Sequence, residues 1–299
     1  MSPMAYGSPL TDISRSPTPE PLPSSPNLSR FFSFLRAAFA VAEEGATANT
    51  LTQRKIVEDR DYYLPFRQLA PSKRIILNDP NGPFSPSRLR TREGLFDALI
   101  FRLVTQASPI ITQAKRVYFG SPAKFSDATE GRAKEFFCNP KATGQHCRFN
   151  NISHVSDYWE HAAGWSSHVG HAEITLESLL MWLTGREGKN TRFYGMGNLV
   201  GWLLASDYAY AGLVKMPEVS EVGRFIFKIN AGGKHGLALL GFNVATEEAC
   251  TDAMDAVWTA LHRSFTSAEI TQMGLDPITI EHALCKFKRL YNSCVAKVR

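Results

Sequence analysis

The chain has 299 residues, of which 44% are hydrophobic and 20% are charged, and its formal net charge is +5. This share of apolar residues is enough for a real core, so a wholly disordered chain is excluded, and the length suits one large domain or two small ones. No stretch approaches the roughly 20 consecutive apolar residues that a membrane helix needs. We therefore expect no membrane contact and, since no secretory leader pattern is present, a place inside the cell.

The cysteine count bears on disulfide bonds, and the net charge bears on a nucleic-acid partner. Five cysteines form no Cys-x-x-Cys pair, and an odd number over this length does not suggest a disulfide framework. We expect free thiols. The positive excess permits a nucleic-acid partner without requiring one, because it is small for a chain of this length.

Residues 1–29 hold seven of the seventeen prolines and seven serines, with few large apolar side chains. Such a segment buries too little surface to offset the entropy cost of ordering, so we predict a disordered Ser/Pro-rich tail. It contains five Ser-Pro or Thr-Pro dipeptides, the kind that proline-directed kinases use. Two interpretations stay open: regulation in the nucleus or cytosol, and an inert linker whose composition alone produces these pairs.

Residues 30–92 are predicted to form a docking helix followed by a basic, irregular connector. Phenylalanines and a leucine crowd one side of a short amphipathic helix over residues 30–44. From Arg54 to Arg92 the chain carries nine Arg or Lys against four Asp or Glu, and five prolines interrupt any regular pattern. A solvated loop and an arm that contacts phosphate both remain open for this connector.

We predict a mostly α-helical domain over residues 93–295. Large apolar residues between Leu95 and Val104 recur at the spacing of one buried helix face. A similar pattern over 174–183 ends before Gly185, which we expect to adopt a left-handed conformation. No alternating apolar pattern persists between hairpin turns, so no sheet is predicted.

Two threonines mark the starts of later helices. Thr246 precedes a first turn that contains Glu247 and Glu248, as expected of an N-cap followed by acids that complement the helix dipole. Thr279 is predicted to open the last helix of the domain.

The most informative segment runs from Arg192 to Tyr208. Gly195 and Gly197 allow a tight turn, and the apolar residues after Asn198 define a helix face. A turn followed by such a helix is the local pattern of a helix-hairpin-helix element. A hairpin of this kind presents backbone amides at a helix start, where they suit a phosphate. An ordinary turn between two helices explains the same pattern, and this alternative stays open.

Three motifs in this order resemble the helical domain found with 5-hydroxymethyluracil DNA kinases and with the alpha-glutamyl/putrescinyl thymine pyrophosphorylases. The likeness covers about residues 95–292 and is clear from 193 onward. The motifs are Gly195-Met-Gly197 with Ala205-Ser-Asp207-Tyr208, then Ala231-Gly-Gly-Lys-His-Gly236-Leu237, then Ile280-Glu-His-Ala-Leu-Cys285-Lys-Phe287-Lys-Arg289.

This resemblance implies an all-helical fold akin to helix-hairpin-helix DNA glycosylases, acting on modified thymine-type bases in duplex DNA. The base would leave the stack and enter a pocket. Asp207 would be the catalytic residue near that pocket. The DNA contacts implied or expected are Gly195, Gly197, Asn198, Lys234, Lys288 and Arg289, the last three as partners of phosphate charge.

The sequence departs from this family at two places. The glycine loop is Gly232-Gly233-Lys234 where Gly-Pro-Gly is expected. The family ends on a Cys-Glu-Phe-Asp-Lys type of run, whereas this chain has lysines at 286 and 288, which reverses two charges. The phosphate-binding GxxxxGK[ST] motif does not occur, so the chain is not itself the kinase, and a separate kinase becomes a candidate partner. We therefore keep two hypotheses: a pyrophosphorylase-like transferase, and a catalytically inactive module that binds DNA or protein. With DNA as the expected partner we expect the nucleus, and the cytosol as the alternative.

The middle of the chain offers weaker signals. Arg148 and Asn150 are candidates for contacts with guanine or phosphate and with adenine, although an Asx turn explains the same residues. Cysteines and histidines between 138 and 171 match no usual zinc spacing, so we expect no metal and no other cofactor.

Overall fold

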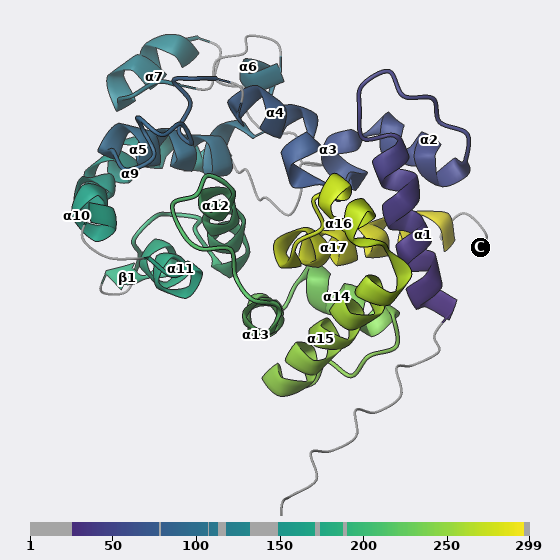
Figure 1. Cartoon of the computed structure of the whole chain (residues 1–299). Helices are drawn as coiled ribbons and strands as arrows, with labels where there is room; N and C mark the ends of the chain where they lie inside the picture. Colours follow the sequence, from purple (N-terminus) through teal and green to yellow (C-terminus); the bar gives the residue numbers. More distant parts are fainter. Residues whose placement is uncertain are drawn as a thin grey trace, which may run out of the picture.

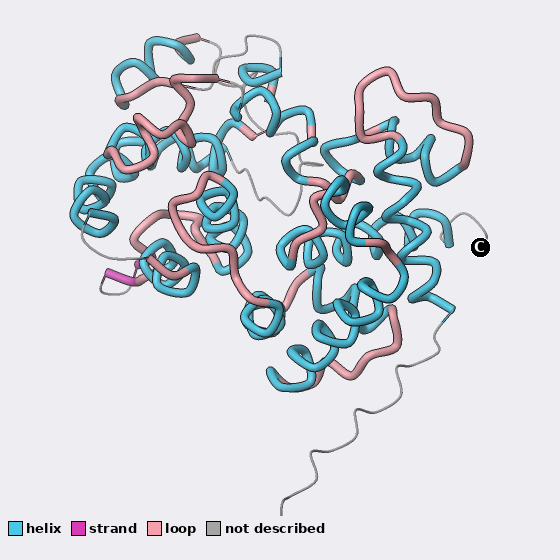
Figure 2. The backbone as a smooth tube through the Cα atoms, in the orientation of Figure 1, coloured by secondary structure: helices cyan, strands magenta, loops and turns pink. Residues whose placement is uncertain are grey.

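The computed structural model describes residues 26–77, 79–106, 108–112, 118–131, 149–170, 174–187 and 190–295. Over these residues the chain is mostly helical, as predicted (Figures 1 and 2). Strands β1 (Arg186–Glu187) and β2 (Asn190–Thr191) form a two-residue antiparallel ladder, a small departure from the prediction of no sheet. Most of the predicted tail lies outside the described residues, and its last four residues form the first turn of a helix.

The helices and helical turns follow one another along the chain as α1 (Pro26–Ala40), α2 (Leu51–Glu58), α3 (Arg60–Tyr63), η1 (Arg67–Leu69), α4 (Pro71–Leu77), α5 (Arg92–Ile100), the π-helical turn η2 (Phe101–Thr105), α6 (Pro109–Thr112), α7 (Pro122–Thr129), η3 (Phe149–His154), α9 (Val155–His161), η4 (Ala162–Gly164), α10 (Trp165–Gly170), α11 (Leu176–Thr184), α12 (Asn198–Tyr210), α13 (Val219–Ile229), α14 (Gly232–Leu239), α15 (Glu247–Ser264), α16 (Ser267–Met273) and α17 (Pro277–Val295).

Helix α1 docks on the C-terminal helices, and it spans Pro26–Ala40 where the sequence predicted a docking helix over residues 30–44. It lies beside α16 and α17 although it comes from the other end of the chain (Figure 1). The Phe31 ring packs 5.5 Å from that of Phe287, and Phe32 lies 5.7 Å from Phe265. The apolar side of α1 thereby becomes part of one hydrophobic core that runs through the described chain.

The basic connector is largely helical up to Leu77, where the sequence predicted irregular chain, and residues 79–91 are irregular as predicted. Helix α2 begins with a capping box, in which the Thr50 hydroxyl accepts from the Gln53 amide and the Gln53 side chain accepts from the Thr50 amide. The helices that follow are too short for apolar periodicity to show. Two of the connector's cations, Arg67 and Lys73, are each only 5% exposed, so they belong neither to a solvated loop nor to an exposed arm.

The boundaries of the other predicted helices are close to the observed ones, with two corrections. Thr246 caps α15 as predicted, its hydroxyl accepting from the Ala249 amide at 3.1 Å. Gly185 ends α11 with φ −56° and ψ 154°, which is extended rather than left-handed. Helix α17 begins before Thr279, because the Asp276 carboxylate accepts from the Thr279 amide at 2.7 Å.

Helix α12 is the centre of the fold and positions the site described below. It packs against α11 and α13 and against the turn η2. Every residue from Val200 to Ala209 is buried, whereas Gly197 and Asn198 at its start are exposed. One end of a core helix therefore reaches the surface (Figure 1). Among the described helices, none is both long enough and apolar enough to cross a membrane.

Candidate functional site

The two-glycine turn before α12 lies at the protein surface. Gly195 has φ +80°, a conformation that glycine adopts without strain. Gly197 starts the helix with no side-chain cap, and Asn198 turns its amide away to the Lys228 carbonyl at 3.2 Å. The first amides of α12 are thus open to solvent or to a ligand.

Beside this turn, a cavity of about 270 Å³ opens between α12, α14 and α17, and we call it the Glu281 cavity. Its walls come from the second and third motifs and from two leucines of α12 that lie between the two parts of the first motif. Its lining includes Leu199, Leu203, Gly232, Glu281, Cys285 and Arg289. Since Leu199 is in the first turn of α12, the cavity and the exposed turn are neighbours.

The glycines of the second motif let α14 approach α17 closely enough to form the cavity wall. A Cβ on Gly232 would lie 2.1 Å from the Cys285 Sγ, and one on Gly236 would lie 2.6 Å from the Leu284 carbonyl oxygen. Real Cβ atoms do not tolerate such distances. The glycines at 232 and 236 are therefore required for packing, not for an unusual backbone conformation.

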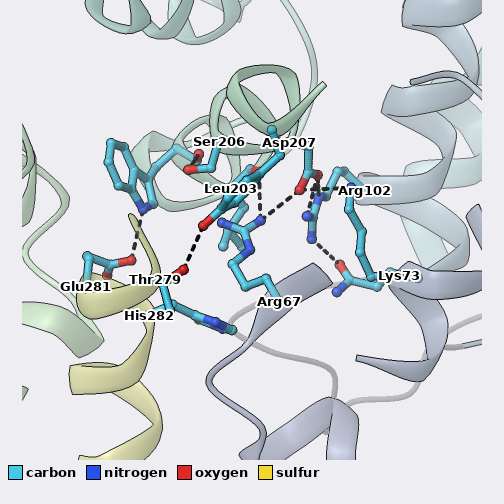
Figure 3. A network of polar contacts seen from close by, with 12 residues as sticks. Arg67, Lys73, Arg102, Leu203, Ser206, Asp207, Thr279, Glu281 and His282 are labelled. Atoms are coloured by element: carbon cyan, nitrogen blue, oxygen red, sulfur yellow. Dashed lines mark hydrogen bonds and ion pairs between the residues drawn. The ribbon is translucent and has the colours of Figure 1, made fainter. Parts of the chain in front are cut away.

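Glu281 is the carboxylic acid of the cavity wall. It is 5% exposed and accepts a hydrogen bond of 3.0 Å from the Trp202 indole (Figure 3). Burial raises the pKa of Glu281, and the hydrogen bond from Trp202 and the charges of Arg67 and Arg289 offset only part of that effect. The side chain thus holds a proton to higher pH than an exposed glutamate.

Basic groups complete the cavity. Lys288 and Arg289 line it, and the Arg289 guanidinium lies 4.9 Å from the Tyr62 ring centre with its buried Nη1 making no hydrogen bond. Lys234 is not part of the lining, and its ammonium lies 4.4 Å from the Phe227 ring centre. Lys286 is fully buried and donates to the carbonyl oxygens of Asp61 and Tyr62, so it adds nothing to a DNA-binding surface.

The structure places Asp207 away from the Glu281 cavity, in a separate buried cluster (Figure 3). Its carboxylate lies 3.0 Å from Arg67 Nη2 and 2.9 Å from Lys73 Nζ, and it also accepts from Arg102 Nε at 2.6 Å. Burial by itself raises the pKa of Asp207, but the charges of Arg102, Lys73 and Arg67 bring it down to about 2. The carboxylate at the cavity is Glu281, a residue of the third motif that no sequence pattern singles out.

The remaining candidates fall wholly or partly outside the described residues. Arg148 is not among the described residues, and for Asn150 only the backbone is described, within η3. The Cys and His candidates for zinc fall partly outside the described residues, and the residues that are described hold no group of three or more potential metal ligands. Neither a family model, nor a curated protein, nor a solved structure matches the chain.

Proposed function

We propose that the chain binds DNA through the exposed turn at residues 194–198 and takes an unstacked thymine-type base into the Glu281 cavity. One observation carries this proposal: a helix start without a side-chain cap adjoins a cavity, and Leu199 belongs to both. Free amides at a helix start, together with the helix dipole, suit a phosphate group. A nucleotide held there by its phosphate presents its base to the cavity.

The charges at the cavity support an anionic partner. Lys288 and Arg289 line the cavity, and the buried Nη1 of Arg289 has a donor to spare. The nearby carboxylate of Glu177 is paired with Lys228 at 3.1 Å, so it leaves little negative charge close to the turn. Because few cations take part, we expect a moderate rather than a steep dependence of DNA affinity on salt.

The size and polarity of the cavity favour a single base. About 270 Å³ is just below the roughly 300 Å³ at which sites for drug-sized ligands begin. A thymine-type base offers one N–H donor between two carbonyl acceptors. The ionised carboxylate of Glu281 can accept a hydrogen bond from that N–H, and the protonated carboxyl group can donate one to a carbonyl oxygen of the base. Trp202 occupies Oε2, and no described group hydrogen-bonds to Oε1.

The resemblance extends this proposal to 5-hydroxymethyluracil as the base, in two forms. In the first form the protein is a transferase, in which an amine displaces pyrophosphate from the activated base. In the second it reads the base without turnover, and Lys288 favours this form because it replaces an acid of the family and lines the cavity. Pyrophosphate release from DNA that carries the activated base selects the first form.

The proposal is tested by mobility shifts of plain and 5-hydroxymethyluracil-containing duplexes at two salt concentrations. We expect both duplexes to bind, the modified one more tightly, and both to weaken as salt rises because bound phosphates release counterions. Glu281→Gln is expected to reduce the preference for the modified duplex and to leave binding of the plain duplex unchanged.

The turn itself is tested by a matched pair of substitutions, Gly197→Asp and Gly197→Asn. A Cβ at Gly197 meets no atom within 4 Å, and both new side chains are good N-caps, so both variants should fold at least as stably as the parent. The aspartate places a negative charge where the phosphate would lie. DNA binding should be lost in Gly197→Asp and largely kept in Gly197→Asn, and equal binding by the two variants contradicts the proposal.

A further inference from the structure

A second, smaller cavity of about 30 Å³ lies beside the Asp207 cluster, between α4, η2, α12 and α17. Its volume is about twice what one water molecule needs, so it takes a small group and not a ring. The polar side chains that line it are Arg67, Lys73, Arg102, Ser72, Asp61 and Gln106. It is separated from the Glu281 cavity by Leu203 and His282, which line both.

Two of the lining cations have donors that the protein does not use. Arg67 binds the Leu203 carbonyl and Asp207 through Nη2 alone, and its buried Nη1 makes no hydrogen bond. Lys73 Nζ lies 2.9 Å from Asp207 Oδ1 in a contact that falls outside hydrogen-bond geometry, and the Phe84 ring centre lies 3.9 Å from Nζ. Leaving buried charged donors unpaired costs free energy, which a suitable acceptor would recover.

The local charge also favours an anion. Three basic side chains face the single carboxylate of Asp207, and all of them are at least nine-tenths buried. Burial lowers the pKa of the Lys73 ammonium to about 7 although the charge of Asp207 opposes this, and an anion bound beside Lys73 would favour its charged form.

Asp61 also lines the cavity and keeps its negative charge, although its two oxygens already accept from the amide and the hydroxyl of Ser72. With Lys73 protonated, the three basic groups still exceed the two carboxylates by one charge. His282 adds no charge, because burial holds its pKa well below the usual range and its Nδ1 donates to the Pro65 carbonyl.

We infer that this cavity binds a small oxyanion, a free phosphate ion or the terminal phosphoryl group of a monoester, through Arg67 Nη1 and Lys73 Nζ. A phosphodiester of a nucleic-acid backbone does not fit, because two ester substituents cannot pass into a space of about 30 Å³ with walls this buried. The inference stands apart from the proposed function, since it needs neither the exposed turn nor the Glu281 cavity.

The test is calorimetric titration of the full chain with sodium phosphate and with dimethyl phosphate, at matched ionic strength. We expect one saturable site for phosphate and none for dimethyl phosphate. Lys73→Met keeps the packing on the Phe84 ring and loses the charge, and Arg67→Lys keeps a cation for Asp207 and loses Nη1. Each variant should bind phosphate about tenfold more weakly or worse, which corresponds to a loss of roughly 1.4 kcal/mol.

Lys215→Met, at an exposed lysine whose ion pair is with Glu218, is the matched control and should bind phosphate like the parent. Absence of saturable phosphate binding by the parent chain overturns the inference, and so does equal affinity in the variants and the parent. Tight binding of dimethyl phosphate overturns it too and points to backbone phosphate. If a variant does not fold, the melting temperature of the parent decides: it must rise with phosphate and not with dimethyl phosphate.

Discussion

Asp207 and Glu281 are two buried carboxyl groups at facing helices whose pKa values move in opposite directions. Burial pushes both values up. Asp207 has three cations within ion-pair distance and its pKa falls to about 2, whereas Glu281 has one neutral indole donor and its pKa is raised. The charges placed around a buried acid, and not its burial, therefore decide its protonation state.

The same difference separates a group fixed for stability from one left open for a ligand. Asp207 is fully buried and every oxygen is satisfied by a cation, so little of it remains to meet a substrate. Glu281 lies in the wall of a cavity with one oxygen free of described partners. Perturbed acids of the second kind are the usual candidates for function.

The largest effect is expected from removing Asp207. Asp207→Ala leaves three buried cations without a counter-ion, and losing one partner of a buried ion pair costs about 3–5 kcal/mol of unfolding free energy. Urea denaturation followed by circular dichroism measures this loss. A loss below about 1 kcal/mol would show that the cations find other partners, and the contrast between the two carboxylates would then disappear.

The second effect concerns the packing that forms the Glu281 cavity. Gly236→Ala places a Cβ 2.6 Å from the backbone oxygen of Leu284, which cannot move cheaply, so we expect a loss of about 1–3 kcal/mol. Gly164→Ala, where a Cβ meets nothing within 4 Å, is the matched control and should change the stability little. Similar denaturation midpoints for the two variants would show that α14 and α17 separate without cost.

Local patterns predicted the helices with a clear apolar face or a capping residue and the motifs around the cavity, but they did not predict the short helices of the basic connector. The exposed turn could be located from Gly195 and Gly197, and the cap at Thr246 from the residue types alone. The Asp207 cluster could not, because it joins residues more than a hundred positions apart, Arg67 and Asp207. A basic composition suggests that these side chains lie at the protein surface. Only the fold shows that Arg67 and Lys73 are buried.

Glu281 was missed for a related reason. Its position in the third motif was visible, but the raised pKa depends on Trp202 and on the tight approach of α14 across the cavity. The local pattern assigned the acid role to Asp207, since a carboxylate near a helix C-terminus opposes the dipole and needs a partner. In the structure these partners are the buried side chains of Arg67, Lys73 and Arg102.

The third effect is a difference in how stability depends on pH. Asp207 has a lowered pKa, so its contribution is present above its ordinary value of 3.8 and is lost as the pH falls toward 2. Glu281 has a raised pKa, so its contribution is present below its ordinary value of 4.5 and is lost as the pH rises through the folded-state pKa. Denaturation of the parent and Glu281→Gln at several pH values checks this.

The glutamine variant should show a smaller decline in unfolding free energy above pH 4.5, and the part that remains should come from other buried acids such as Asp97, whose pKa burial raises to about 6. The acid-side loss due to Asp207 should stay the same in both proteins. The difference should be smaller than either mutational effect above, because Trp202 can still donate to the glutamine oxygen. An unchanged decline in Glu281→Gln would mean that another group titrates there.

The smallest expected effect is a difference in reagent access between the two cysteines whose side chains the structure describes. Cys285 lines the Glu281 cavity and is partly exposed, whereas Cys250, in α15, is fully buried. Burial raises the pKa of both thiols, so alkylation by iodoacetamide should be slow at neutral pH and faster at higher pH, since the thiolate is the reactive form. Peptide mass spectrometry should find Cys285 modified before Cys250.

A duplex that carries 5-hydroxymethyluracil should then protect Cys285 and leave Cys250 unchanged, because a base in the cavity covers only the first thiol. Gly197→Asp provides the control, since it should abolish protection without altering the alkylation rate in the absence of DNA. Protection of both thiols would mean that DNA acts on the whole molecule, by slowing its opening, and not at the cavity. If DNA binds and neither thiol is protected, the DNA contact is confined to the exposed turn. No nucleobase then enters the cavity beside Glu281.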